Sequence, residues 1–571
     1  MPQQLIVTRK QALIATAFCA FFYLYPFPYY PKINNPNENV RFYMTASIVE
    51  RGTYAIDAMR ARWGWVGDAA ANNGSAYSVK APGTSFLGIP GYALYYYGIK
   101  LAQKRYERTV ALRLCRLTAS ILPTLFFLFF FYRWLARQTS HPLLRDTVYF
   151  SVAIGSLFYG YAVIFVSHTL SAAAGFGAFM MLFDIRRDPP SQTSRKKLFV
   201  AGLLTASATL FEYPGLVASL ILSIYALFAV RPLSRLVHYA FGGLAPTLVV
   251  MHFQWRAFGS PFTPGHLMVE NPAFRSAHLE GLYGAVGPSV EALYGLLLDP
   301  AAGLFPLTPI MLFSLFGFGI LLRNQSQRLD SIIALSIAAL TLLTICSMNN
   351  WRGGWTIGPR YLALVVPFAA WGSLVCLERV AKKLPRLSFS LALGCTAAAI
   401  VASGLPSAYY PHIPPDFTRP LSQLFSLLIA HDYAPYNWGN LFGSYGTRSM
   451  WPLGLAAVLL ILFCLKSVYG FSDRLKIVVT STCVALCLLW PLLTDNGREE
   501  PAVVRAVDFV TQNWSPEGHD LAARLFRDVE NARPEAFDVK KRRLIDVLMR
   551  EGRFEEARRI GSSSTQKPAS R

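Results

Sequence analysis

The feature that constrains this chain most is a succession of apolar stretches, each close to twenty residues long, between residue 11 and residue 493. A helix of about 20 apolar residues crosses the hydrocarbon core of a bilayer. Only 15% of the residues are charged, whereas soluble domains carry about 25%. The pattern therefore predicts an all-α polytopic membrane protein.

We predict about thirteen transmembrane helices. They cover residues 11–30, 109–132, 147–166, 168–184, 198–213, 215–230, 236–257, 303–322, 330–347, 358–377, 387–405, 451–469 and 476–493. No small-residue cleavage site follows the first stretch, so we expect it to be a retained anchor.

Short basic loops alternate with longer loops that contain few cations. Residues 186–197 hold five Lys or Arg residues, whereas residues 259–302 hold only Arg275. The positive-inside rule then predicts a bacterial inner-membrane protein with a cytoplasmic N-terminus. Loops 31–108, 259–302 and 406–450 and the tail 496–571 become periplasmic. The net charge of +22 fits lipid headgroups better than nucleic acid.

Two segments of loop 31–108 are predicted to be interfacial helices. Residues 84–99 are apolar, but sixteen residues reach only about 24 Å, short of the ~30 Å core. Counting them as a span would also reverse the sidedness of every later loop. Residues 39–50 form the second candidate, which ends at Gly52. The tail is expected to be a small solvated helical segment, although the residues around Gly552 resemble half of a tetratricopeptide-like helical hairpin.

Loop 31–108 also holds the densest set of groups that could perform chemistry. Chemistry at a membrane surface that activates a hydroxyl and releases an anion needs a carboxylate near the hydroxyl and cations near the anion. Glu38 follows the first span directly, although a charge at a helix N-terminus would explain it too. Asp68 lies in a Gly/Asn-rich segment, where aspartate also serves as a turn former. Asp57 is a further carboxylate.

Cationic candidates lie in this loop and in one other. Lys80 precedes an Ala-Pro-Gly turn, and a lysine reaching toward the membrane surface is the alternative reading. Arg352 and Arg360 flank a Trp-Gly-Gly-Trp segment in a loop otherwise poor in cations, where lipid headgroups could also be their partners. His168 falls at a predicted span end and is either a site residue or a hydrogen-bonded structural histidine. Glu212, beside Pro214, is a weaker candidate.

Three segments carry a resemblance to a known family: residues 36–41 (PNENVR), 77–83 (YSVKAPG) and 351–361 (WRGGWTIGPRY). Together with the order of spans, they resemble the GT-C glycosyltransferases, closest to aminoarabinose transferases and protein O-mannosyltransferases. The resemblance implies a polyprenyl-phosphate sugar as donor and a glycan, lipid or protein as acceptor. It implies donor-phosphate roles for Lys80, Arg352 and Arg360, with Arg41 and Tyr77 as supporting residues.

One departure from the resemblance matters. The families open this loop with Asp-Glu, whereas this chain has Asn37 before Glu38. An amide cannot accept a proton from a hydroxyl at neutral pH. The base is then Glu38 or another loop carboxylate, or the protein has lost transferase activity.

The sequence thus predicts a membrane glycosyltransferase, inverting because no second carboxylate is clearly placed as a nucleophile. The alternatives are a catalytically silent scaffold of the same fold and a lipid-linked sugar flippase. No resident cofactor is certain. A divalent cation is conceivable if Glu38 and Asp68 converge in space. Loop 259–302, rich in Pro and Gly, is either a mobile lid or a static connector.

Overall fold

The computed structural model describes residues 7–26, 35–189, 194–430, 432 and 434–494. Of the tail it describes residues 538, 540–542, 544, 545, 548, 549 and 554–562, the last of which form α28 (Phe554–Ser562). The predicted turn at Gly552 lies outside these residues. The regular elements of the described residues are helices apart from one two-stranded hairpin, so the expected polytopic helical class is confirmed.

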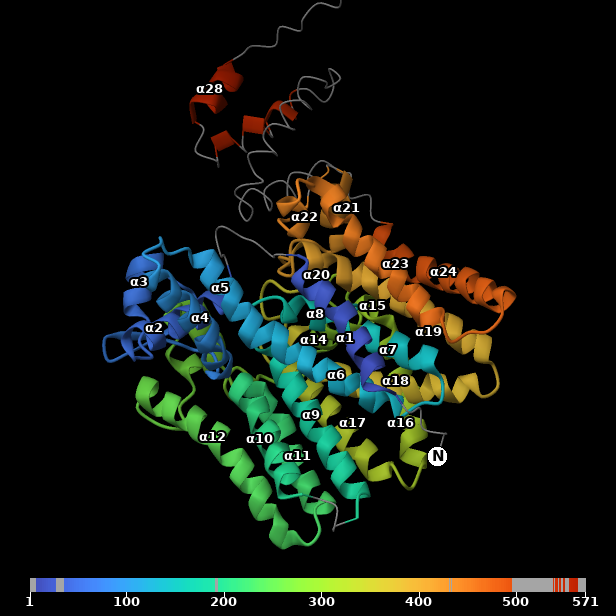
Figure 1. Ribbon diagram of the computed structural model, residues 1–571. Helices are drawn as coiled ribbons and strands as arrows, with labels where there is room; N and C mark the ends of the chain where they lie inside the picture. The colour runs from blue at the N-terminus through green and yellow to red at the C-terminus, as the bar shows by residue number, and fades with distance from the viewer. Residues whose placement is uncertain are drawn as a thin grey trace, which may run out of the picture.

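Seven helices among the described residues are long and apolar enough to cross a membrane (Figure 1). They are α5–η1–α6 (Arg108–Ala136), α9 (His168–Arg187), η4–α12 (Leu233–Phe258), α17 (Arg328–Cys346), α19–η8–α20 (Pro385–Tyr409), η10–α23 (Gly446–Leu465) and α24 (Phe471–Leu493). Each coincides with a predicted span. The total of thirteen stays a prediction.

Shorter helices fill the spaces between these seven. They are α1 (Arg9–Leu24), α7 (Pro142–Ala153), α8 (Leu157–Ala162), α10 (Arg195–Phe211), η3 (Tyr213–Gly215), α11 (Leu216–Ala229), α14 (Val290–Leu297), α15 (Leu304–Leu307), η6 (Pro309–Leu312), α16 (Phe313–Arg323), α18 (Val366–Ala381), η9 (Leu421–Phe425), α21 (Ser426–Ala430) and α22 (Trp438–Leu441).

At least three predicted spans differ from the helices found; one of them, residues 303–322, is divided among α15, η6 and α16. Residues 147–166 form two helices, because the chain breaks after Ala153 and Ser156 caps α8 by accepting from the Phe158 N–H. Residues 358–365 precede α18, which begins at Val366. Three glycines with positive φ, at positions 353, 354 and 358, turn the backbone there instead.

Loop 31–108 folds into α2 (Pro36–Arg51), α3 (Asp57–Trp63), a hairpin of β1 (Ala69–Asn72) and β2 (Ser75–Ser78), and α4 (Gly83–Leu101). Helix α2 begins where the Asn35 side chain accepts from the Asn37 N–H, and it ends at left-handed Gly52. The hairpin turns at Asn73-Gly74, both with positive φ, as a two-residue turn of this kind requires. The sequence analysis did not predict these strands.

Helix α4 packs closely on its neighbours rather than standing apart. A Cβ at Gly91 would lie 2.4 Å from the Leu114 carbonyl oxygen, and one at Gly88 would lie 2.6 Å from the Phe165 ring. Glycine at these positions lets α4 cross α5 and the segment before α9 at short range. Although it has 19 residues, α4 is not among the seven spanning candidates.

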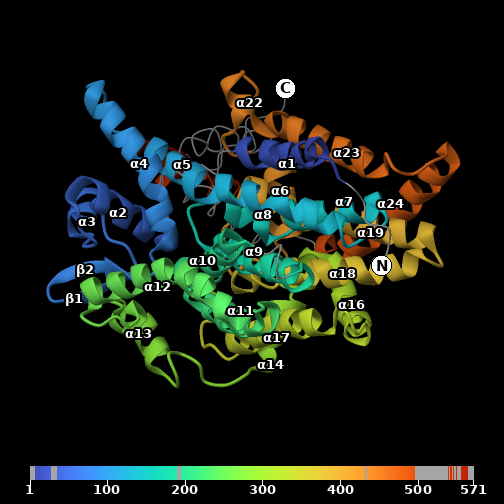
Figure 2. The same ribbon diagram turned by 60° about the horizontal axis from the view of Figure 1, so that its bottom comes forward.

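Loop 259–302 is joined to the rest of the fold at two places along its length. The Glu270 N–H donates to the Ala69 carbonyl of β1 at 3.0 Å, and Arg60 binds the Glu270 carboxylate at 2.7 and 2.9 Å. Farther on, the Val286 N–H donates to Ser347 at 2.8 Å. In Figure 2 the hairpin lies beside α12 and α13 (Pro272–Leu279). These contacts favour a static connector over a lid.

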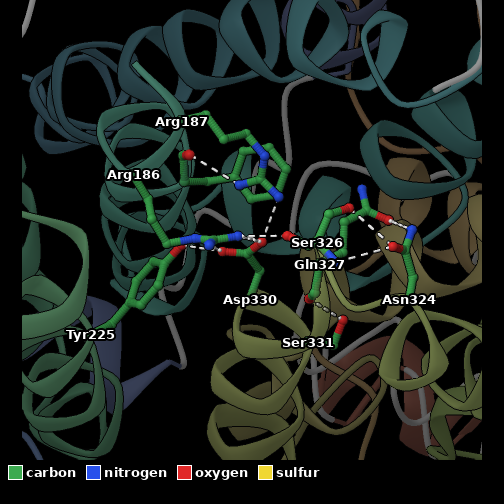
Figure 3. A network of polar contacts seen from close by, with 9 residues as sticks. Arg186, Arg187, Tyr225, Asn324, Ser326, Gln327, Asp330 and Ser331 are labelled. Atoms are coloured by element: carbon green, nitrogen blue, oxygen red, sulfur yellow. Dashed lines mark hydrogen bonds and ion pairs between the residues drawn. The ribbon is translucent and has the colours of Figure 1, made fainter. Parts of the chain in front are cut away.

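The C-terminal end of α9 is held by a buried carboxylate (Figure 3). Asp330, in the first turn of α17, receives Arg186 at 2.9 and 2.7 Å and Arg187 at 2.5 Å. The Tyr225 hydroxyl of α11 also donates to it. We call these four residues the Asp330 cluster. It ties α9, α11 and α17 together.

Candidate functional site

A cavity of about 940 Å³ opens between loop 31–108, loop 259–302 and helices α10, α11 and α12. Its polar part is lined by Asn37, Lys80, Glu212, Gln254, His266, His278 and Tyr361. Its apolar part is lined by side chains of the three helices, among them Ala206, Leu216, Leu220, Leu244 and Val250. The cavity therefore has both polar and apolar lining residues, and its volume falls in the size range of ligand sites.

Six charged or titratable side chains gather beside the cavity, of which Lys80 and Glu212 line it, and we call the six the cavity cluster. They are Arg41, Asp68, Lys80, His168, Glu212 and Arg360, and direct or electrostatic interactions connect them all. Three cations face two carboxylates, which leaves one positive charge when the histidine is neutral. Such a site is suited to an anion.

The hairpin brings Lys80 and Asp68 together. The Val79 N–H donates to the Asp68 carbonyl at 3.2 Å, one step beyond the β1–β2 register. This places the Lys80 ammonium 3.2 Å from the Asp68 carboxylate. A Cβ at Gly83 would lie 2.7 Å from the Leu210 carbonyl oxygen, so the turn after Lys80 rests directly on the end of α10.

Arg41 lies at the centre of the cluster and is fully buried. Its guanidinium donates to the Asn37 side-chain oxygen and to the Ser167 hydroxyl, the latter at 2.6 Å. It also lies 3.5 Å from the Glu212 carboxylate. Arg41 thus stands between Asn37 on one side and Glu212 on the other.

Glu212 reaches the cavity because the chain breaks between α10 and η3. Its backbone is extended, and the next helical turn begins at Tyr213 with Pro214 as its second residue. The Ser167 hydroxyl, at the N-cap position of α9, donates to Glu212 Oε2 instead of capping the helix. His168 Nδ1 lies 3.5 Å from the same oxygen. The imidazole packs edge-on against Tyr161 and Tyr361, and its Nε2 has no partner among the described residues.

The two arginines of residues 351–361, both predicted to bind the donor phosphate, lie in different surroundings. Arg360 joins the cavity cluster, because Gly353 leaves it room: a Cβ there would lie 2.6 Å from Arg360 Nε. Its guanidinium donates to the Tyr361 hydroxyl at 3.1 Å. Arg352 instead lies 3.6 Å from Asp299 and does not line the cavity.

The two carboxylates of the cluster have opposite pKa shifts. Burial raises the pKa of Asp68, but Lys80 and Arg360 outweigh it and hold that pKa below its ordinary value of 3.8. Burial also raises the pKa of Glu212, and there the opposing Arg41 offsets only part of the effect, so that pKa stays above 4.5. A pair of carboxylates with pKa values driven apart is typical of functional sites.

Glu38, the first catalytic candidate from the sequence, lies elsewhere. Its carboxylate is buried, receives Arg116 at 2.6 and 2.7 Å, and accepts from the Phe165 N–H at 2.7 Å. It does not line the cavity. Arg116 lies 78 residues farther along the chain, so sequence proximity to the membrane could not reveal this partner.

Asp57 and Tyr77 have structural contacts outside the cavity lining. The Asp57 carboxylate accepts from the Ala76 N–H at 3.1 Å and so holds the hairpin to α3. The Tyr77 ring packs edge-on against Phe258, with 6.0 Å between ring centroids. Neither Asp57 nor Tyr77 lines the cavity.

The sequence analysis missed Ser167, which donates to Glu212, and four polar residues of the cavity lining: Tyr361, Gln254, His266 and His278. Ser167 and Tyr361 adjoin residues that were singled out, which was the available signal. The imidazoles of His266 and His278 lie 5.0 Å apart. Burial lowers the pKa of both, to about 3 for His266, so both are neutral at pH 7.

Glu38 and Asp68 do not converge on a cation site, since each is bound to a different basic residue. Within the described part of the chain, no three His, Cys, Asp or Glu side chains are grouped to hold a metal ion. No step proposed below uses one.

Comparisons with known proteins find similarity only at the level of structure. No protein-family model matches the chain, and no curated protein matches it. Among solved structures it is similar to ArnT from Cupriavidus metallidurans bound to undecaprenyl phosphate, at 15% identity and a TM-score of 0.44, covering 89% of this chain and 80% of that one. It is also similar to the apo Archaeoglobus fulgidus oligosaccharyltransferase, at 11% identity and a TM-score of 0.42, covering 74% and 57%. The sequence analysis predicted a resemblance to GT-C glycosyltransferases, and solved structures of that kind are found. Because both TM-scores lie below 0.5, the proposals below are argued from the site itself.

Proposed function

We propose that this protein is a membrane glycosyltransferase that takes a sugar from a polyprenyl-phosphate donor and transfers it, on the periplasmic face, to a hydroxyl of a glycan, lipid or protein. The observation that carries the proposal is the amphiphilic cavity. Its apolar part over α10, α11 and α12 suits a lipid chain, and Lys80 stands at its polar part. Such a cavity matches a molecule that is part lipid and part phosphate sugar.

Lys80 is the proposed ligand of the donor phosphate. As the bond from the anomeric carbon to the phosphate oxygen breaks, negative charge grows on the phosphate, and a preorganised cation stabilises that charge. Asp68 fixes the position of the lysine at 3.2 Å. Arg360 and Arg41 add positive potential behind it.

We propose a single displacement with inversion. A double displacement with retention needs a carboxylate nucleophile in addition to the acid–base group. Of the carboxylates in the described residues, Glu212 alone lines the cavity.

The test is release of a labelled sugar from its carrier. The full-length protein is purified in detergent and incubated with radiolabelled polyprenyl-phosphate sugars and a membrane extract. A transferase moves label from the carrier to an acceptor. A flippase, reconstituted in liposomes, moves the labelled lipid between leaflets without releasing the sugar. A silent scaffold does neither, and either of these two results would contradict the proposal.

A further inference from the structure

The carboxylate that faces the cavity is held by one oxygen only. The Ser167 hydroxyl, Arg41 Nη2 and His168 Nδ1 all approach Glu212 Oε2. Within the described part of the chain no group bonds Glu212 Oε1. Glu212 is thus oriented by three neighbours while one oxygen remains available to a ligand in the cavity.

The other acidic candidates are occupied. Both oxygens of Glu38 receive the Arg116 guanidinium, and the Asp68 carboxylate is paired with Lys80. A proton acceptor must come within hydrogen-bonding distance of the hydroxyl that it deprotonates. Among the carboxylates of the described residues, only Glu212 combines a place in the cavity lining with an available oxygen.

We infer that Glu212 is the catalytic base of the transfer, an inference that rests on the proposed function. Glu212 Oε1 removes the proton from the acceptor hydroxyl while the acceptor oxygen bonds to the anomeric carbon. The bond from that carbon to the phosphate oxygen breaks, and its electron pair leaves with the polyprenyl phosphate beside Lys80. The protonated Glu212 then returns its proton to solvent.

Arg41 explains how a chain with Asn37 can still supply this carboxylate. The Arg41 guanidinium binds the neutral Asn37 side chain on one side and lies 3.5 Å from the charged Glu212 on the other. Both residues line the cavity. Of the two side chains that flank Arg41, only Glu212 is therefore a carboxylate. A carboxylate moved to position 37 would face the same cavity.

The ionisation of Glu212 gives a readout that a purely structural residue does not. The charged or titratable groups that face it are Arg41, Asp68, Lys80, His168, Tyr213 and Arg360. Because its pKa is raised above 4.5, kcat/KM of the wild type should fall as the pH drops through a value above 4.5.

The experiment compares wild type, Glu212→Gln and Glu291→Gln in the label-release assay across pH. Glu291 is an exposed glutamate of α14 and serves as the matched control. We expect Glu212→Gln to lower kcat/KM by about 10²- to 10⁴-fold, the usual size of a base contribution, and to lose the acid limb. Glu291→Gln should match the wild type.

A second variant guards against misfolding, since Glu212→Gln leaves Arg41 without its nearest counter-charge. The double variant Asn37→Asp/Glu212→Gln restores a carboxylate on the other side of Arg41. If the single variant does not fold, the folded double variant should release label with an acid limb. A folded double variant that releases label at the wild-type rate without an acid limb overturns the inference, because turnover then depends on no carboxylate at either position.

The outcomes separate the two proposals. An active wild type with an equally active Glu212→Gln, or a weakened Glu212→Gln that keeps the wild-type acid limb, overturns the role of Glu212 and leaves the transferase intact. A wild type that releases no label from any donor overturns both.

Discussion

The two ends of α9 carry polar clusters with the same excess of positive charge, but the clusters differ in how fully their hydrogen-bonding atoms are paired. Across about 30 Å of helix, His168 belongs to the cavity cluster and Arg186 and Arg187 to the Asp330 cluster. In both, cations outnumber carboxylates by one. In the Asp330 cluster both carboxylate oxygens are bonded twice, Oδ1 to Arg186 and Tyr225 and Oδ2 to Arg186 and Arg187.

The cavity cluster is left incomplete. His168 Nε2, Arg41 Nε and Arg360 Nε have no partner among the described residues, and Glu212 Oε1 is available. Buried polar atoms are normally paired, so unpaired ones need an explanation. The difference teaches that the saturated cluster holds helices together, whereas the incomplete one is arranged for a ligand.

The largest expected effect breaks the saturated cluster. Asp330→Asn removes the charge that compensates two arginines, and loss of one partner from a buried pair costs about 3–5 kcal/mol. Thermal unfolding in detergent should show a large drop in Tm. Asp473→Asn, which breaks an exposed pair with Arg386, should cost at most about 1 kcal/mol. An Asp330→Asn protein that is stable but inactive would show that the Asp330 cluster takes part in function, which would contradict the comparison.

The next effect concerns Glu38. Like Asp330, it has both carboxylate oxygens bonded to arginine. Glu38→Gln should cost about 3–5 kcal/mol of stability, because it leaves Arg116 buried without its carboxylate. In protein that folds, kcat/KM should remain within about threefold of the wild type, because Glu38 does not line the cavity. Stability is measured by Tm and turnover by label release. A folded variant that loses turnover a hundredfold would return the catalytic role to Glu38.

A smaller effect on stability, but a large one on turnover, is expected at Lys80, whose partner Asp68 is only partly buried. Lys80→Ala should lower kcat/KM by about 10²- to 10³-fold, the cost of removing one preorganised group that stabilises transition-state charge. Lys104→Ala, an exposed lysine just beyond α4, is the matched control. Wild-type turnover in the Lys80 variant would remove the phosphate from this part of the cavity.

The smallest effect is expected at the hairpin. Asp57→Asn weakens the acceptor for the Ala76 N–H and should cost about 1 kcal/mol. Turnover should fall only a few-fold, because the hairpin still pairs Asp68 with Lys80. The pair of measurements is Tm and label release. A complete loss of turnover at unchanged Tm would show that Asp57 has a direct role.

How far the sequence could predict this structure depends on the range of the contact. Apolar runs of spanning length are local, so seven predicted spans were found as helices. The break at residues 154–156 was missed because it follows from packing: a Cβ at Gly155 would lie 2.7 Å from Ala399. The Asn73-Gly74 turn was a local signal for a hairpin, and it was read only as a turn.

In the site, too, residues close in sequence were predicted better than contacts between remote residues. Lys80, Asp68, Asn37 and Arg41 are close in sequence and were identified together. Glu38 and Glu212 were ranked in an order that their geometry does not support, because their partners Arg116 and Arg41 are remote in the chain. Long-range ion pairs leave no local pattern in a single sequence.

The measurement that tests the central claim most directly is where a lipid phosphate binds. A photoreactive polyprenyl phosphate is cross-linked to the full-length protein in detergent, and the labelled peptides are identified by mass spectrometry. We predict labels on α10, α11 and α12, lost in Lys80→Ala and competed by polyprenyl phosphate more strongly than by the uncharged alcohol. Labels elsewhere, unaffected by Lys80→Ala, would contradict the assignment of this cavity as the donor site.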